Sequence, residues 1–170
     1  MRRLRRGDRV PEEVRERAGL AGVKVLAHGQ AQDGSWLLGT REHLVIVLAG
    51  GGVRHLPWGQ VQEAEWDKDD QRLVISEVGR FGEVRPQHAF VLEDEGLLLQ
   101  LVRERVQASV VLQRHVAVSG KRGVKVIGRR RPDGSVEWMV EYDIGIDPDA
   151  PEVVRRVDAA LEQARRDAGE

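Results

Sequence analysis

The strongest constraint on the fold is the rapid alternation of short β-rich runs with turn residues between positions 24 and 92. Glycine and aspartate separate the runs, as in Asp33-Gly34 and Gly50-Gly51-Gly52, because glycine accepts positive φ and aspartate bonds its own backbone. The spacing predicts a small antiparallel sandwich or barrel. The expected strands are residues 24–31, 36–40, 43–49, 53–58, 61–67, 72–78 and 84–92.

One of these runs, residues 44–48, is aliphatic on both alternations, so we expect a central strand buried on both faces. A helix should follow the last strand, because Asp94 can cap it and Leu98, Leu101 and Val102 begin an apolar stripe at helical spacing. The valine-rich residues 107–118 fit either a continuation of this helix or a strand, and periodicity does not decide between them.

The two ends of the chain have their own patterns. Residues 1–10 form a basic arm, and residues 11–18 predict a short helix that begins with proline and acids. Near the other end, residues 123–129 and 136–144 predict a β-hairpin, and residues 150–168 predict an amphipathic helix. Asp149 and Glu152 have capping-box spacing. We expect an arm and helix over 1–22, a domain over 23–113, and a hairpin and helix over 114–170 docked on that domain.

Composition limits the possible functions. The chain has 170 residues, a net charge of −1 and no cysteine, which excludes disulfides, thiol catalysis and thiolate metal sites. A near-neutral molecule has no global field for nucleic acid or anionic lipid, so any such binding must be local. Charged residues interrupt every apolar window, and we expect a cytoplasmic protein without a transmembrane segment.

Two segments resemble bacterial pleckstrin-homology-like (PH-like) domains. In Trp36-Leu37-Leu38-Gly39-Thr40-Arg41-Glu42-His43-Leu44-Val45, a threonine and a basic residue precede an apolar strand. In Leu56-Pro57-Trp58-Gly59-Gln60-Val61, an apolar residue, a proline and an aromatic residue lead into the next sheet. The resemblance covers about residues 23–113. It implies an α+β fold, a seven-stranded antiparallel PH-like sandwich or barrel closed by a helix, and a role in binding or scaffolding.

The motifs of common catalytic and metal sites are incomplete in this sequence. The histidines are dispersed over different expected strands, which argues against a metal site. Asp67, Asp69 and Asp70 open like a calcium loop, but Arg72 and Val78 stand where glycine and glutamate are required. The triple glycine lacks the lysine and helix of a P-loop. We therefore expect no cofactor, no metal and no enzymatic activity.

A basic segment near the C-terminus is the main electrostatic anomaly, because no acid interrupts it between positions 114 and 131. Its candidate anion-binding residues are Lys121, Arg122, Lys125, Arg129, Arg130 and Arg131. The alternative is internal neutralisation by Glu137, Glu141 and Asp143 on the neighbouring strand of the hairpin. A separate candidate protein interface comprises Trp138, Val153, Val157 and Leu161, although core packing is the default for such residues.

Three functions remain open from the sequence. The first is a non-enzymatic interaction or scaffolding module that binds a protein partner or a second copy through strand edges or the last helix. The second is a binder of anionic surfaces, such as nucleic acid or membrane lipid, through the basic segment. The third is an enzyme of unidentified class, for which no catalytic constellation can be named.

Overall fold

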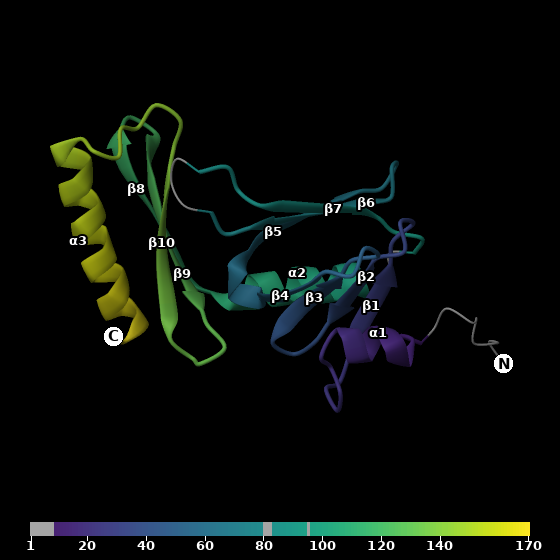
Figure 1. Cartoon of the computed structure of the whole chain (residues 1–170). Helices are drawn as coiled ribbons and strands as arrows, with labels where there is room; N and C mark the ends of the chain where they lie inside the picture. The colour runs from purple at the N-terminus through teal and green to yellow at the C-terminus, as the bar shows by residue number, and fades with distance from the viewer. Residues whose placement is uncertain (1–8, 80–82, 95) are drawn as a thin grey trace. The chain divides into compact units, whose positions relative to one another are not determined.

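The computed structural model describes residues 9–79, 83–94 and 96–170. These residues form an α+β protein with three antiparallel sheets of four, three and three strands and three α-helices (Figure 1). The chain divides into two compact units, Met1–Val106 and Gln107–Glu170. No helix in the described ranges is long and apolar enough to cross a membrane.

The N-terminal unit contains two sheets, and all seven strands expected from the sequence are present. The first sheet is a meander of β1 (Ala27–Gln30), β2 (Trp36–Gly39), β3 (His43–Val47) and β4 (Val53–Pro57). After a 3-10 turn at Trp58–Gln60, the second sheet follows with β5 (Val61–Asp67), β6 (Arg72–Glu77) and β7 (Gln87–Val91). A bridge between Ala31 and Leu92 connects the ends of β1 and β7. The predicted antiparallel arrangement is therefore confirmed.

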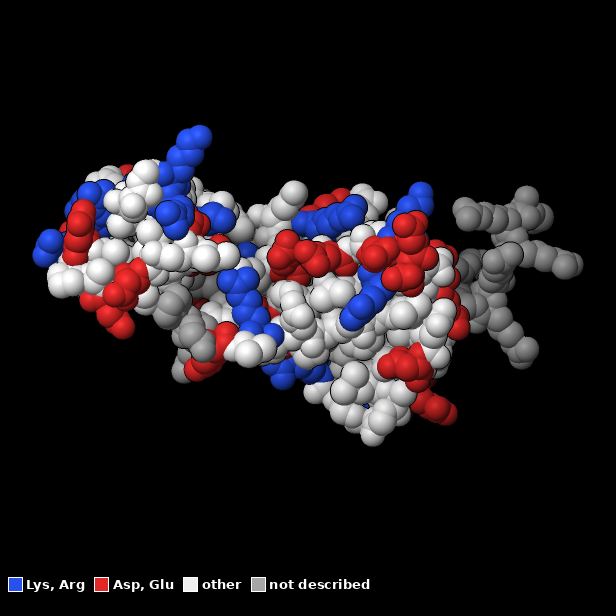
Figure 2. Space-filling model, turned by 90° about the horizontal axis from the view of Figure 1, so that it is seen from above, with Lys and Arg blue, Asp and Glu red and all other residues white. Residues whose placement is uncertain are grey.

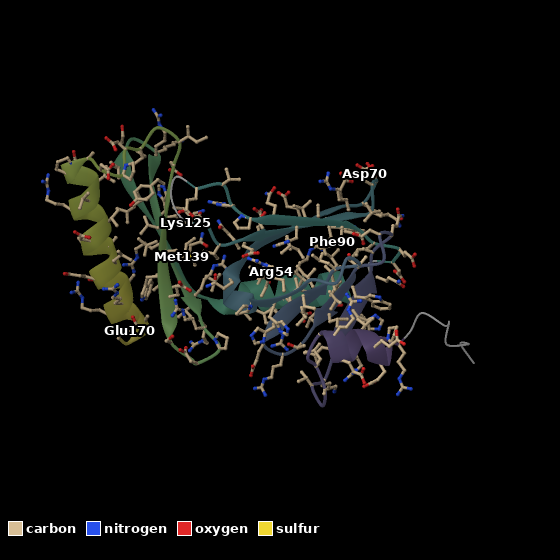
Figure 3. All side chains as sticks on the ribbon, viewed as in Figure 1. Arg54, Asp70, Phe90, Lys125, Met139 and Glu170 are labelled. Carbon is tan, nitrogen blue, oxygen red and sulfur yellow. The ribbon has the colours of Figure 1, made fainter. Side chains whose placement is uncertain are left out.

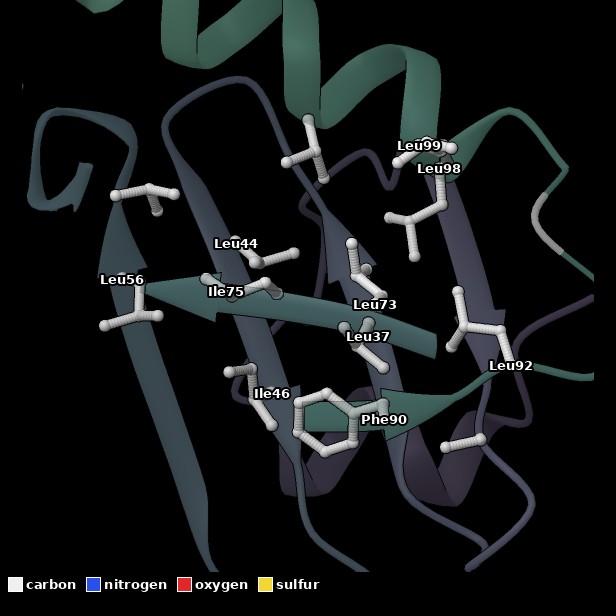
Figure 4. Close-up of a cluster of buried hydrophobic side chains, with 14 of the residues drawn as sticks. Leu37, Leu44, Ile46, Leu56, Leu73, Ile75, Phe90, Leu92, Leu98 and Leu99 are labelled. Atoms are coloured by element: carbon white, nitrogen blue, oxygen red, sulfur yellow. The ribbon is translucent and has the colours of Figure 1, made fainter. Parts of the chain in front are cut away.

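Strand β3 is buried on both faces, as its aliphatic sequence predicts. Leu44 and Ile46 point into the main core between the sheets (Figure 4). Val45 and Val47 lie in a second core on the opposite face. The short helix α1 (Glu12–Arg17) contributes Val14 to that second core. The aliphatic run continues one residue beyond β3, but its last side chain is not buried. Leu48 lies in the following turn and is 42% exposed.

Helix α2 (Leu98–Ser109) completes the main core with Leu98, Leu99 and Val102. Gly29 in β1 permits the close approach of α2 to this strand. A Cβ atom at position 29 would lie 3.0 Å from the Leu98 side chain. Asp94 does not cap the helix, so that expectation was wrong. Its Oδ1 atom instead accepts a hydrogen bond from the Gly96 amide, and the helix begins only at Leu98.

The C-terminal unit is a three-stranded sheet covered on one face by a helix. Residues 107–118, left undecided by the sequence, end α2 at Ser109 and then form strand β8 (Val110–Ser119). Strands β9 (Arg122–Arg130) and β10 (Val136–Tyr142) form the predicted hairpin, in the sheet order β10-β9-β8.

Helix α3 (Pro151–Ala168) packs on this sheet within its own unit. Val153 and Val157 pack with Val124, and Ala160 and Ala164 pack with Val126. Its N-cap is Ala150, without a side-chain hydrogen bond, so the expected capping box does not form. Docking of this segment on the N-terminal domain stays a prediction.

Candidate binding surfaces

The backbone of β9 separates the candidate basic residues into groups. Arg122 and Arg130 begin and end this strand, so at about 3.3 Å per residue they stand roughly 26 Å apart. Lys121 lies in the turn before β9, and Arg131 follows it. The candidate residues therefore form two groups at opposite ends of β9. Lys125 and Arg129 lie between these two groups.

Two of the cations are paired with acids of the neighbouring strand. Arg131 lies 2.9 Å from the Glu137 carboxylate, and Lys125 lies 3.5 Å from that of Glu141, its partner in the β9–β10 register. The hydrogen bond and charge of Glu137 raise the pKa of Arg131. Internal neutralisation, the alternative interpretation of the basic segment, thus has a geometric basis at both positions. Lys125 is labelled in Figure 3.

Arg129 differs from the other candidates because it is only 5% exposed. Its Nη1 atom donates a hydrogen bond of 3.1 Å to Ser109 Oγ. Burial lowers the pKa of this guanidinium, and the charge of Glu141 opposes that shift. A guanidinium buried in this way is not part of an exposed phosphate-binding surface.

The remaining candidates, Lys121, Arg122 and Arg130, are exposed. Within the described ranges none of the three forms an ion pair. Arg130 Nη1 approaches the Gly134 carbonyl oxygen at 3.4 Å, which orients its side chain along the hairpin loop. Lys121 and Arg122 are thus the exposed pair at one end of the sheet, and Arg130 stands at the other.

Trp138 packs within the C-terminal unit. Its indole covers Gly128, where a Cβ atom would lie 2.7 Å from Trp138 Cζ3. The indole Nε1 atom donates a hydrogen bond of 2.9 Å to the Glu170 carboxylate. Val153 and Val157 are buried and Leu161 is half-buried against the same sheet. Val153 and Val157 are therefore used inside this unit, whereas Trp138 and Leu161 pack there only in part.

A polar cluster in the N-terminal unit was not identified from the sequence. The Glu77 carboxylate lies 2.6 Å from Arg54 Nε and 2.6 Å from His88 Nε2, and so connects β4 of the first sheet with β6 and β7 of the second. Burial alone raises the pKa of Glu77, but hydrogen bonds and charges from Arg54 and His88 lower it overall. The signal was present, because Leu73, Ile75 and Glu77 alternate along one strand face and place Glu77 beside the core.

The histidines and acids of the described residues are possible metal ligands by residue type. In the described part of the chain, no group of three or more histidines and acids is arranged to hold a metal ion. His43 and His55 form an edge-on ring pair with centroids 6.1 Å apart. Asp67 Oδ1 accepts hydrogen bonds from the amides of Asp69 and Asp70, as expected for a hairpin turn.

Comparisons with protein-family models, with curated proteins and with solved structures give no match. The geometry of the chain itself is therefore the basis for a functional proposal.

Proposed function

We propose that this protein is a non-enzymatic interaction module whose N-terminal unit is PH-like. The observation that carries the proposal is the order of four strands, three strands and a helix, in which α2 supplies Leu98, Leu99 and Val102 to the core between the sheets. This order agrees with the resemblance over residues 23–113. A scaffold of this kind positions strand edges and loops for binding and requires no catalytic constellation.

The local chemistry supports binding more than catalysis. The polar cluster of Arg54, Glu77 and His88 is held together by hydrogen bonds to the Glu77 carboxylate, one of which joins the two sheets. Such a cluster stabilises the relative position of the strands, because the carboxylate already has both of its partners. We assign it a structural role.

A second candidate function is binding of an anionic surface. The exposed pair Lys121 and Arg122 favours it, since the structure of the described residues gives these cations no acidic partner. Lys125 and Arg131 contribute less, because Glu141 and Glu137 neutralise them. Few free cations imply few phosphate contacts and therefore weak binding at physiological salt.

Affinity capture with the full chain tests the proposal. The chain is immobilised and incubated with native extract, with and without nuclease, and retained proteins are identified by mass spectrometry. We expect retention of a specific protein that nuclease treatment leaves unchanged. Retention of nucleic acid or lipid without a protein would instead favour the second candidate.

A further inference from the structure

Strand β5 forms one edge of the sheet β5-β6-β7. One side of β5 is hydrogen-bonded to β6. On its other side, between Glu63 and Asp67, no strand of the described residues is paired with it. Every second residue of an edge strand presents an unpaired N–H and C=O outward. The segment from Glu63 to Asp67 is therefore a backbone template for one more strand.

The outer face of this strand is acidic. Glu63, Glu65 and Asp67 alternate with half-buried residues and are all exposed. No described residue forms an ion pair with Glu63 or Glu65, and their cross-strand neighbours are Ser76 and Val74. Residues 61–72 contain five acids and two bases, a net charge of 2 − 5 = −3. Acidic side chains gather over this sheet in the space-filling view (Figure 2).

The inner face of the same edge is apolar and incompletely covered. Ala64 and Trp66 are partly buried and pack against the main core. The indole Nε1 atom of Trp66 is buried and has no hydrogen-bond acceptor among the described residues. A buried donor without an acceptor is unfavourable, which makes the Trp66 indole a sensitive reporter of changes at this edge.

The charge pattern selects among possible occupants. Antiparallel pairing of two β5 strands about Glu65 would set Glu65 against its copy and Glu63 against the copy of Asp67. Like charges directly opposite one another are destabilising, so the acids disfavour a second copy at this edge. The same acids favour a strand with basic side chains at alternate positions.

We propose that the β5 edge binds an extended basic segment of another protein, which adds as a fourth strand to the sheet β5-β6-β7. Its lysine or arginine side chains face Glu63 and Glu65, and its intervening apolar side chains lie over Ala64 and Trp66. This inference rests on the proposed interaction function and names the surface and the chemistry of the partner.

The test uses the full chain and capped seven-residue peptides. One peptide alternates lysine with valine, a second alternates glutamate with valine, and a third is the lysine peptide N-methylated at every peptide bond. Binding is measured by fluorescence titration and by the indole N–H resonances of the 15N-labelled chain. Glu63→Lys/Glu65→Lys reverses the edge charge, Glu63→Gln/Glu65→Gln neutralises it, and Glu13→Lys/Glu16→Lys on α1 is the matched control.

We expect the lysine peptide to bind and to shift one indole resonance, and the glutamate and N-methylated peptides to fail. Charge reversal should weaken lysine-peptide binding roughly tenfold or more and give affinity for the glutamate peptide, with the α1 control unchanged. Equal binding of the N-methylated peptide, or equal binding to wild type and both edge variants, would overturn the inference. If wild type and the folded edge variants capture the same protein equally, the β5 edge is not the binding site, although the proposed interaction function still stands.

Discussion

Trp138 stands directly opposite Gly128 in the β9–β10 ladder, and its indole occupies the space that a side chain at position 128 would need. The pair shows why a glycine is present inside a strand: it leaves a surface on which the indole packs beside α3. Gly128→Ala should destabilise the protein by about 1–3 kcal/mol, because the added methyl displaces the ring.

Denaturant unfolding followed by circular dichroism measures this effect. Gly50→Ala is the control, since a Cβ at position 50 meets no atom within 4 Å, and its unfolding midpoint should stay close to that of wild type. Equal midpoints for Gly128→Ala and wild type would show that the indole does not depend on this close approach.

The buried carboxylate of Glu77 predicts a pH-dependent contribution to stability. Its pKa is below the ordinary value of 4.5, so its contribution is present above the pKa of the unfolded chain. That contribution is lost as the pH falls through the lower folded value. Glu77→Gln should lower the free energy of unfolding at pH 7 by about 1–3 kcal/mol, because Arg54 and His88 lose their acceptor charge.

The difference between wild type and Glu77→Gln should shrink on acidification below about pH 4.5, as the wild-type carboxyl is protonated. Urea unfolding at pH 7, 5, 4 and 3 measures it. The exposed-site variant Glu63→Gln is the control and should stay within about 0.5 kcal/mol of wild type. A difference that is constant over this range would contradict the assigned ionisation of Glu77.

The two faces of α3 differ in their tolerance of charge. Val157 is buried against the sheet, whereas Val154, on the same helix, is 43% exposed. Val157→Asp should destabilise the protein by about 3 kcal/mol or more, because it buries an unpaired carboxylate and removes apolar contacts. Val154→Asp should cost less than about 1 kcal/mol. Thermal melts of the two variants compare these effects, and similar melting temperatures would show that α3 is not docked through Val157.

Substitutions of the arginines at the end of the basic segment should affect stability according to how deeply each side chain is buried. Arg129→Ser removes a buried, hydrogen-bonded guanidinium and should cost about 1–3 kcal/mol of stability. Arg130→Ser/Arg131→Ser removes exposed cations and should change stability by less than about 0.5 kcal/mol. Gel-shift and liposome-sedimentation assays at low salt complete the comparison. Strong low-salt binding that disappears in the double variant would favour the anionic-surface function over the protein-interaction function.

The sequence predicted the strands of the N-terminal unit well, because their signals are local. Turn glycines and aspartates separate the strands, and the aliphatic run that contains Leu44 and Ile46 correctly identified the strand buried on both faces. The cap positions were wrong at both Asp94 and Asp149, since a capping residue and the first residue of a turn have the same sequence signature.

The candidate sites were harder to predict because they depend on tertiary placement. Most residues of β9 are buried on both alternations, and the sequence does not reveal that Arg129 is buried while Arg130 is exposed. The cluster around Glu77 joins residues distant in the sequence, and no local pattern links Arg54 to His88. Pairing between strands, and not the composition of either strand, determines both sites.

We propose that the full chain acts by binding another protein. Size-exclusion chromatography with light scattering, applied to the purified chain mixed with the protein retained from nuclease-treated extract, tests it most directly. We predict a single co-eluting complex of defined mass whose absorbance ratio shows no nucleic acid. Separate elution of the two proteins at concentrations well above those of the capture would contradict the claim.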